Sequence, residues 1–437
     1  MGARETALNV LLVCRRDGGW SNGALKAYTA RDRLDSRDSA LAARLCYGVL
    51  QNRNLLDFYL QQLLTGRIKD LHPIVLDILH MGLYQLYLMD KIPESAAVNE
   101  AVELAKKYCR KQKNAPGLVN GVLRNAVRSK GSLKEPNSWE DLYSHPGELI
   151  HLLKSYVGKA RIEPMLRANN SVAPITAQVN TLKISPDALQ ERLRAEGVTG
   201  MPHPWLSNCL ILSGTGNLEQ LSSFREGLFY VQDAAARLSV QCAEIQPGQR
   251  VLDCCAAPGG KSFAAAISMN GQGSVTSCDV HAHKIDLIAK GVQRLGMGMI
   301  TPTLQDATEF RSQWENGFDT VIADVPCSGL GIIRKKPDIR YKDLSAIQEL
   351  LPLQRSILDT VSRYVKPGGM LLYSTCTLVQ AENEGMVEQF LLSHPDFTPE
   401  PLPLPEPFPK NESGMLALIP GEYDTDGFFI CRLRRNL

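Results

Sequence analysis

Two cysteines in the second half of the chain each follow a strand-like run of residues and could supply a thiolate. Cys327 lies within residues 324–329 (DVPCSG), and Cys376 lies within residues 373–377 (YSTCT). A thiolate is a strong nucleophile that can attack C6 of a pyrimidine ring, after which C5 can take a methyl group and must then lose its proton. A free cysteine taken alone is more often a small buried apolar residue. Two cysteines at the carboxyl ends of parallel strands, where ligands bind in open α/β sheets, favour the catalytic interpretation.

The residues that precede these cysteines contain a turn suited to a nucleoside-containing cofactor. Residues 251–261 (VLDCCAAPGGK) are typical of a strand that enters a small-residue turn and then a helix. Gly259 and Gly260 would let a ligand approach the backbone closely. Asp279 ends the next strand-like run, 19 residues beyond Gly260, where a carboxylate can accept hydrogen bonds from the hydroxyls of a ribose.

The sequence of the turn bears on the class of cofactor. A dinucleotide site normally shows GxGxxG, which holds a pyrophosphate at a helix N-terminus, whereas this turn reads AAPGGK. S-adenosylmethionine has a ribose and an adenine but no phosphate, so the departure favours it. Two alternatives stay open at this point. One is a nicotinamide oxidoreductase, and the other is a glycine-rich loop that only turns the chain, with Asp279 as an ordinary turn residue.

These motifs lie in a region where strand-like and helical stretches alternate. The strand-like runs cover residues 250–254, 274–279, 319–324 and 370–374. Alternation of this kind predicts a parallel sheet with helices on both faces. Proline occupies every second position from Pro399 to Pro409, so we expect an extended loop there, leading into a final strand at residues 427–432.

The N-terminal part of the chain has a different pattern. Apolar residues recur at helical spacing from about residue 4 to residue 128, and no alternating strand pattern interrupts them. We therefore predict an all-helical domain over residues 1–140. Residues 141–235 combine an alternating stretch at 176–182 with a predicted helix at 186–196, which indicates a small α+β connecting region. Residues 236–437 would then form the cofactor-binding domain.

The composition is that of an ordinary globular protein. The 437 residues are 44% hydrophobic, 6% aromatic and 22% charged. Runs of about 18 uncharged apolar residues and the features of a signal peptide are absent, so we expect neither a membrane span nor signal-directed secretion. The 11 cysteines include no CxxC pair, which suits the reducing cytoplasm. His281 and His283 follow Cys278, but no second cluster completes a metal site, and we predict no metal.

The net charge of +2 hides an asymmetry between the two parts of the chain. Residues 1–140 carry 21 Lys and Arg against 14 Asp and Glu, and the other residues carry 27 against 32. Cations that could neutralise the phosphates of a nucleic acid gather in one stretch. They are Lys106, Lys107, Arg110, Lys111, Lys113, Arg124, Arg128, Lys130 and Lys134. A solvated helix face is the plainer interpretation of this stretch, because Tyr108 is its only aromatic residue.

The motifs together resemble a known family, the S-adenosylmethionine-dependent RNA cytosine-5 methyltransferases. The resemblance covers most of residues 220–437 and is carried by AAPGGK at 256–261, Asp279, Asp306, DVPCSG at 324–329, STCT at 374–377 and DGFF at 426–429. It implies that Cys376 is the nucleophile and that Cys327 assists product release. It also implies a catalytic Asp324, between cofactor and base, where it could hydrogen-bond the cytosine ring. The implied cofactor-binding residues are Cys255, Ala256, Ala257, Pro258, Gly259, Gly260, Lys261, Asp279, Asp306 and Asp324.

The N-terminal helical region is similar to the antitermination factor NusB, an RNA-binding helical protein. The similar segments are residues 94–106 (ESAAVNEAVELAK) and 117–124 (GLVNGVLR). This similarity moves the interpretation of the basic stretch toward RNA binding. The combination resembles the family of bacterial 16S ribosomal RNA cytosine-5 methyltransferases B, also called RsmB, Fmu or Sun. It implies a multidomain fold with an all-α NusB-like N-terminal domain, a small α+β connector and a C-terminal α/β Rossmann-like methyltransferase domain.

The resemblance also implies the substrate. It is small-subunit ribosomal RNA, with cytosine 967 of 16S rRNA as the target base. We expect a monomer that needs no metal and no membrane. The main rival from another class is a NusB-like RNA-binding protein whose second domain has lost catalysis, and the intact pair of cysteines argues against it.

Overall fold

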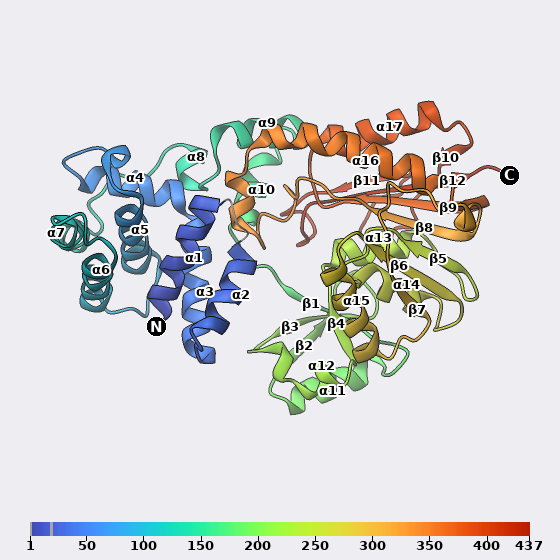
Figure 1. Ribbon diagram of the computed structural model, residues 1–437, viewed down its shortest axis with the longest axis horizontal. Helices are drawn as coiled ribbons and strands as arrows, with labels where there is room; N and C mark the ends of the chain where they lie inside the picture. Colours follow the sequence, from blue (N-terminus) through green and yellow to red (C-terminus); the bar gives the residue numbers. More distant parts are fainter. Residues whose placement is uncertain (1, 18–20) are drawn as a thin grey trace. The chain divides into compact units, whose positions relative to one another are not determined.

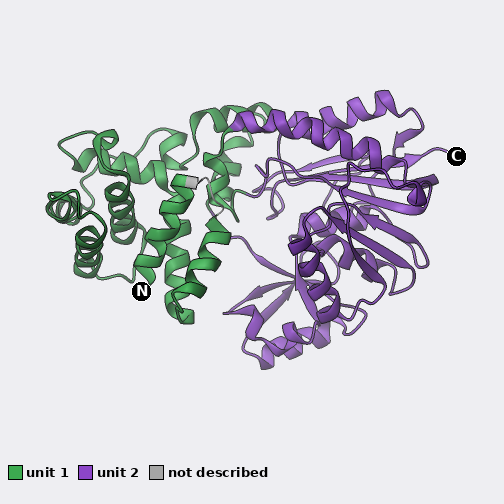
Figure 2. Ribbon diagram, viewed as in Figure 1, with its two compact units in different colours: residues 1–170, 333–343 green, residues 171–332, 344–437 purple. Residues whose placement is uncertain are grey.

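The computed structural model describes residues 2–17 and 21–437, which divide into two compact units (Figure 2). The helical unit comprises residues 1–170 and 333–343, and the α/β unit comprises residues 171–332 and 344–437. The boundaries expected from the sequence, after residues 140 and 235, stay predictions. No helix within the described residues is both long enough and apolar enough to cross a bilayer.

The helical unit confirms the prediction of an all-helical N-terminal region (Figure 1). Its helices begin at residues that favour a helix start, as at Asp35, whose side chain accepts a hydrogen bond from the Asp38 amide at 2.7 Å. The elements are α1 (Ala3–Asp17), α2 (Ser21–Arg31), α3 (Ser36–Gln51), α4 (Arg53–Leu63), η1 (Ile68–Asp70), α5 (Pro73–Leu88), α6 (Glu94–Tyr108), α7 (Ala115–Arg128), α8 (Trp139–Leu142), α9 (Gly147–Val157), α10 (Ile162–Asn169) and η4 (Pro337–Tyr341).

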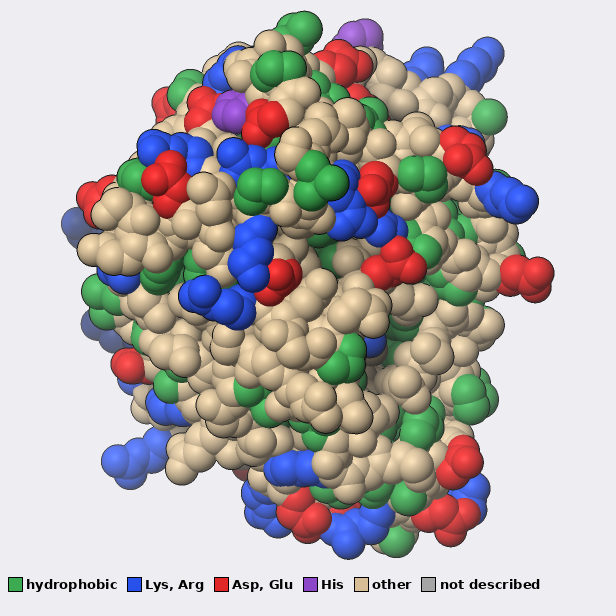
Figure 3. Space-filling model, turned by 90° about the vertical axis from the view of Figure 1, so that its right-hand side faces the viewer, with side chains coloured by type: hydrophobic (Ala, Val, Ile, Leu, Met, Phe, Trp, Pro, Cys, Tyr) green, Lys and Arg blue, Asp and Glu red, His purple; other side chains and the backbone are tan. Residues whose placement is uncertain are grey.

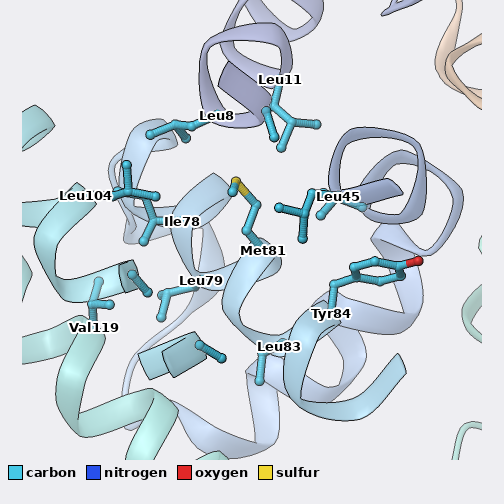
Figure 4. Packing of buried hydrophobic residues seen from close by; sticks show 14 of the residues in the cluster. Leu8, Leu11, Leu45, Ile78, Leu79, Met81, Leu83, Tyr84, Leu104 and Val119 are labelled. Carbon is cyan, nitrogen blue, oxygen red and sulfur yellow. The ribbon is translucent and has the colours of Figure 1, made fainter. Parts of the chain in front are cut away.

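Helix α5 forms the centre of the helical core. Ile78, Leu79, Met81 and Leu83 are buried on it, and α1, α3, α4, α6 and α7 pack around it (Figure 4). A Cβ atom at Gly82 would lie 2.6 Å from Cδ1 of Leu123, so glycine allows α7 to approach this closely. Burial on nearly every side explains why α5 carries apolar residues around most of its circumference.

A short segment from the second half of the chain completes the helical unit. Residues 333–343 follow the Cys327 loop in sequence and form the turn η4 within this unit. The guanidinium of Arg340 is buried, and its Nη1 donates to the carbonyl oxygens of Gln51, Tyr143 and Ser144 at 2.9–3.2 Å and to Oδ1 of Asn170 at 3.1 Å. One arginine therefore joins three segments of the helical unit.

The α/β unit begins with a small antiparallel sheet in the order β2-β3-β1-β4. Its elements are β1 (Ile175–Val179), α11 (Pro186–Ala195), β2 (Thr199–Pro202), β3 (Cys209–Ser213), η2 (Leu218–Gln220), α12 (Ser222–Arg225) and β4 (Phe229–Val231). Leu189 and Leu193 of α11 pack against apolar residues of one face of this sheet. This part confirms the small α+β region expected from the sequence.

The rest of the α/β unit is built on one large sheet in the order β10-β12-β9-β8-β5-β6-β7, with β11 paired to β12. Helices α13, α14 and α15 cover one face and α16 and α17 the other, as predicted (Figure 1). The elements are α13 (Ala234–Cys242), β5 (Arg250–Asp253), α14 (Gly260–Ser268), β6 (Ser274–Asp279), α15 (Ala282–Leu295), β7 (Ile300–Leu304), η3 (Ser312–Trp314), β8 (Phe318–Asp324), η5 (Leu344–Ala346), α16 (Ile347–Ser362), β9 (Val365–Thr375), η6 (Gln380–Glu382), α17 (Glu384–Ser393), β10 (Phe397–Pro399), β11 (Met415–Leu418) and β12 (Phe428–Arg435).

The large sheet contains the parallel strands expected from the sequence and adds antiparallel strands to them. Strands β5 to β9 pair in parallel, whereas β12 pairs with β9, β10 and β11 in the antiparallel direction. The connections between β10, β11 and β12 contain no helix, and a strand that returns without a helical crossover runs antiparallel. The sheet is therefore mixed, but all its parallel strands present their carboxyl ends at one edge.

Candidate active site

The two cysteines meet because β8 and β9 are neighbouring parallel strands. Asp324 and Ser374 are register partners at the ends of these strands. Cys327 follows β8 by three residues and Cys376 follows β9 directly. Their sulfur atoms lie 3.4 Å apart, within the range of an S–H···S hydrogen bond.

The surroundings of Cys327 favour its protonated form. The hydrogen bond with Cys376, burial, and the negative charges of Glu382 and Asp324 all raise the pKa of Cys327 well above its usual value. Cys327 therefore keeps its proton near neutral pH and can donate it in a hydrogen bond to the sulfur of Cys376. A thiolate on Cys376 would be stabilised by that donor.

Asp324, which ends β8, is held by two neighbours. Its Oδ1 accepts a hydrogen bond from Oγ of Ser374 at 2.8 Å, and its Oδ2 lies 2.6 Å from Nζ of Lys261. The ammonium of Lys261 also lies 5.1 Å from the ring centroid of Phe428, in the closing DGFF segment. Lys261 thus contacts the carboxylate of Asp324, beside the cysteines. The expectation that Lys261 binds the cofactor stays a prediction.

The turn between β5 and α14 needs its glycines. Gly259 has a φ of +109°, a conformation that side-chain-bearing residues rarely adopt, and α14 begins at the next residue. A Cβ atom at Gly259 would lie 2.6 Å from Cζ of Phe263, and one at Gly260 would lie 3.0 Å from Nε2 of Gln232. The amide of Ala256 donates to the carbonyl of Cys278 at 2.7 Å, which ties the turn to β6.

Asp253, the last residue of β5, is fully buried and has no role in the sequence-based interpretation. Burial raises the pKa of its carboxyl to about 7. Oγ of Ser262 donates to its Oδ2 at 2.7 Å, and Ser277 in turn hydrogen-bonds Ser262. Oδ1 of Asp253 has no partner among the described residues. This carboxyl joins the start of α14 to β5 and thereby supports the cofactor turn.

The two other predicted cofactor carboxylates follow the next strands of the sheet. Asp279 ends β6 and accepts a hydrogen bond from the amide of His281 at 3.1 Å, with Nζ of Lys284 at 3.4 Å. Asp306 comes two residues after β7, and its Oδ1 accepts hydrogen bonds from the amide and hydroxyl of Thr308. Its Oδ2 accepts none from the described residues, so it can take a proton donor of a ligand.

These residues fit S-adenosylmethionine. The ligand offers ribose hydroxyls and an adenine amino group as donors, and Asp279 and Asp306 offer carboxylate acceptors at adjacent strand ends. Val280, next to Asp279, leaves 52% of its surface exposed at this edge, which gives an apolar side chain for a flat ring to contact. Sequence reasoning missed Val280, because a single valine after a strand carries no recognisable signal.

Sequence reasoning also missed Glu382, which is buried beside the cysteine loops. No cluster of three or more His, Cys, Asp or Glu side chains that could hold a metal ion occurs in the described part of the chain. The rings of His281 and His283 stack at 5.6 Å near the cofactor carboxylates, and the thiol of Cys278 is buried.

The chain matches three protein-family models along its length. A model described as 16S rRNA methyltransferase RsmB/F matches residues 240–434. The NusB family matches residues 1–128, and a model described as Methyltr_RsmF/B-like, ferredoxin-like domain, matches residues 145–219. The three matches correspond to the three kinds of structure in the chain.

Curated relatives match nearly the whole length of this chain. The chain is 35% identical over 446 residues to the probable ribosomal RNA small subunit methyltransferase B of Bacillus subtilis (strain 168), covering 99% of this chain and 98% of the relative. It is 34% identical over 444 residues to the ribosomal RNA small subunit methyltransferase B of Vibrio cholerae serotype O1, covering 100% and 98%. The crystal structure of PH0851 aligns with a TM-score of 0.81 at 26% identity and covers 98% of each chain.

Proposed function

Since the chain belongs to the RsmB family of 16S ribosomal RNA methyltransferases and is an S-adenosylmethionine-dependent RNA cytosine-5 methyltransferase, we propose that it acts through a covalent cysteine adduct on cytosine 967 of 16S rRNA. The single observation that carries the mechanism is the 3.4 Å separation of the sulfur atoms of Cys327 and Cys376. The choice of base rests on the family and on the NusB-like unit. The proposal places the enzyme in the cytoplasm, as a monomer, with ribosomal RNA as its partner.

In this proposal Cys376 is the nucleophile. Its thiolate forms a bond to C6 of the cytosine, and the electron pair of the C5–C6 double bond becomes available at C5. The hydrogen bond from the protonated Cys327 thiol stabilises the attacking thiolate before the bond forms. S-adenosylmethionine supplies the methyl group as an electrophile.

Asp324 and Lys261 orient the base in this proposal. Each oxygen of the Asp324 carboxylate accepts one contact within the protein, which leaves lone pairs for a donor on the cytosine ring. The ammonium of Lys261 keeps this carboxylate in place at 2.6 Å. The base must leave its stack to reach these groups, so an unpaired or weakly paired cytosine would react fastest.

Cys327 assists the release of the product in the second half of the reaction. Once the sulfur of Cys376 is bonded to C6, the hydrogen bond that did most to raise the pKa of Cys327 is lost. Cys327 then becomes more acidic, gives its own proton to solvent water, and as a thiolate can serve as the base that takes the proton from C5. The C5–H electron pair restores the double bond, and the S–C6 bond breaks with its pair returning to Cys376.

Cofactor and RNA would bind to different parts of the protein. The turn from Cys255 to Lys261, with Asp279, Asp306 and Asp324, would hold the cofactor at the carboxyl edge of β5 to β8. The helical unit, which matches the NusB family, would hold the RNA through the basic stretch that begins at Lys106.

Separate replacement of the two cysteines tests their roles. We expect Cys327→Ala to methylate and then accumulate a covalent RNA adduct, seen as a slow band on a denaturing gel that collapses after ribonuclease treatment. Cys376→Ala and the double variant should form no adduct and transfer no methyl group, while cofactor affinity stays near that of the wild type. An adduct in Cys376→Ala but not in Cys327→Ala would reverse the two roles. Bisulfite mapping of 16S rRNA from a deletion strain tests the choice of base.

A further inference from the structure

Glu382 is a fully buried carboxylate that the mechanism above uses only through its negative charge near Cys327. It ends the turn η6, six residues after Cys376. Its Oε1 accepts hydrogen bonds from the amide of Ser328 at 2.8 Å and from Nε2 of Gln354 at 3.0 Å. Its Oε2 accepts from Oγ of Ser328 at 2.5 Å and from Oγ1 of Thr377 at 3.0 Å. A buried carboxylate is costly unless donors surround it, and here four donors do so.

The donors come from both cysteine loops. Ser328 follows Cys327 directly and Thr377 follows Cys376 directly. Oγ of Ser328 and Oγ1 of Thr377 also lie 2.7 Å apart, so the two hydroxyls and the carboxylate form one closed group. A single side chain therefore fixes the residue next to each thiol.

Other contacts fix the group itself. The hydroxyl of Tyr373 donates to the carbonyl of Glu382 at 2.5 Å, which holds the turn η6 against β9. Nε2 of Gln354 on α16 also donates to the carbonyl of Pro326 at 2.9 Å. The amide of Gly331 donates to the carbonyl of Cys376 at 2.9 Å and provides a backbone link between the loops. Contacts with β9 and α16 thus fix the position of Glu382, and its own hydrogen bonds fix the positions of both loops relative to it.

We propose that Glu382 is a positioning residue for methyl transfer, which holds the Cys327 and Cys376 loops together so that their thiols stay in contact. This inference rests on the roles proposed above for the two cysteines. The thiols sit on separate loops after separate strands, and an error of about 1 Å in the placement of a reacting group can cost on the order of 100-fold in rate. A carboxylate suits the position because it accepts from all four donors at once.

The separation of the thiols can be measured without RNA or cofactor. Diamide oxidises two neighbouring thiols to a disulfide and is itself reduced to the hydrazine, taking up two electrons and two protons. The rate at which the Cys327–Cys376 disulfide forms, followed by mass spectrometry of the linked peptides, reports how often the sulfurs meet. This rate does not depend on which cysteine is the nucleophile.

Two variants of Glu382 separate positioning from bulk stability. In Glu382→Ala we expect disulfide formation to slow at least about tenfold and kcat to fall about 100-fold, with cofactor affinity within about twofold of the wild type. In Glu382→Gln the amide oxygen can still accept from Ser328 and Gln354, and the amide nitrogen can donate to the two hydroxyls. We therefore expect this variant to stay within about threefold of the wild type in both rates.

The test includes a control variant and an alternative variant for the case that Glu382→Ala does not fold. Glu400→Ala removes a carboxylate that contacts Arg434 twice at 2.8 Å and Arg432 at 3.2 Å, away from the cysteine loops, and should change neither rate. If Glu382→Ala does not fold, the double variant Ser328→Ala, Thr377→Val removes two of the four donors and should slow both rates. Wild-type rates in whichever of these variants folds, or equal loss in Glu382→Gln and Glu382→Ala, would overturn the proposal. Failure of the cysteine roles would appear separately, in the adduct experiment.

Discussion

Asp253, Asp279 and Asp324 each end a parallel strand of the large sheet, yet their surroundings differ. Asp253 is fully buried, and the pKa of its carboxyl is about 7. Asp279 accepts a hydrogen bond from the His281 amide and contacts Lys284, and Asp324 is paired with Lys261 at 2.6 Å. One residue type therefore serves three purposes, because the burial and the hydrogen-bond and charge partners of the three carboxyls differ. Asp253 supports the turn, and the other two face the ligands in the proposed mechanism.

Replacement of Asp279 tests its proposed contact with the ribose. We expect Asp279→Ala to weaken S-adenosylmethionine binding by about 1.5–3 kcal/mol, because hydroxyl donors lose a charged acceptor. Isothermal titration calorimetry measures this loss directly. Asp286→Ala, which removes an exposed carboxylate from α15, the helix that follows Asp279, serves as the control. Unchanged affinity in Asp279→Ala would remove this residue from the cofactor site.

The buried Asp253 predicts a dependence of stability on pH. Its pKa is about 7 in the folded protein and about 4 in an unfolded chain, so between these values the folded state binds more protons. Its contribution to stability is therefore complete below pH 4 and is lost as the pH rises toward 7. Asp253→Asn does not titrate, so its free energy of unfolding should rise relative to the wild type by roughly 2–3 kcal/mol between pH 5 and pH 8.

Asp319→Asn provides the comparison for this experiment. Burial alone would raise the pKa of Asp319, but hydrogen bonds from the Arg250 amide and from Lys366 lower it on balance. Its carboxylate is then charged throughout the range from pH 5 to pH 8, so the difference from the wild type should stay constant. Chemical denaturation at several pH values measures both variants. A constant difference for Asp253→Asn as well would mean that its carboxyl is ionised when folded.

The residues that touch ligands could be predicted from the sequence more readily than those that support them. Asp279 ends β6, Cys376 directly follows β9 and Cys327 lies three residues after β8, and the periodicity of the strands reveals where each strand ends. Glu382 lies in an irregular turn near a second glutamate, Glu384, and only tertiary contacts distinguish the two. Val280 is likewise recognisable only from its exposure.

Three elements were hard to predict because their place in the fold depends on contacts that the local sequence does not specify. Strand β7 carries Pro302, which disrupts a strand pattern, and the structure places it at the edge of the sheet, where a proline is tolerated. The direction of β12 depends on its pairing with β9, which no local pattern specifies. The turn η4 contains charged residues that resemble those of a surface loop, although Asp338 and Arg340 are buried.

The turn η4 should stabilise the helical unit through Arg340. Arg340→Ala would leave the carbonyl oxygens of Gln51, Tyr143 and Ser144 and Oδ1 of Asn170 without this donor, at a cost of about 2–4 kcal/mol. Hydrogen exchange at the ends of α3 and α10 should report the loss. Arg67→Ala removes an exposed arginine paired with Asp70 and should cost less than about 0.5 kcal/mol. Equal effects of the two variants would mean that the hydrogen bonds of Arg340 contribute nothing.

Charge is distributed unevenly over the whole molecule. On the side of the α/β unit drawn in Figure 3, Lys and Arg side chains are interspersed with Asp and Glu side chains. In the basic stretch of the helical unit some cations are neutralised, since Lys106 contacts Glu103 at 2.7 Å and Lys107 contacts Glu5 at 2.5 Å. Arg110, Lys111 and Lys113 are exposed and form no ion pair with any described residue. Arg124, Arg128 and Lys134 are likewise exposed and without an ion pair among the described residues, so six cations of the stretch are available to bind phosphates.

The salt dependence of RNA binding distinguishes phosphate contacts from a solvated helix face. If Arg110, Lys111 and Lys113 each neutralise a phosphate, replacing all three with Gln should reduce the slope of log affinity against log salt by roughly 2 to 3. Lys106→Gln, Lys107→Gln is the matched control, because these lysines are already paired with glutamates, and it should change the slope less. Deleting residues 1–140 would be a poorer test, since it would also remove α3, with which η4 packs. An unchanged slope in the triple variant would mean that Arg110, Lys111 and Lys113 neutralise no phosphate and form only a hydrated surface.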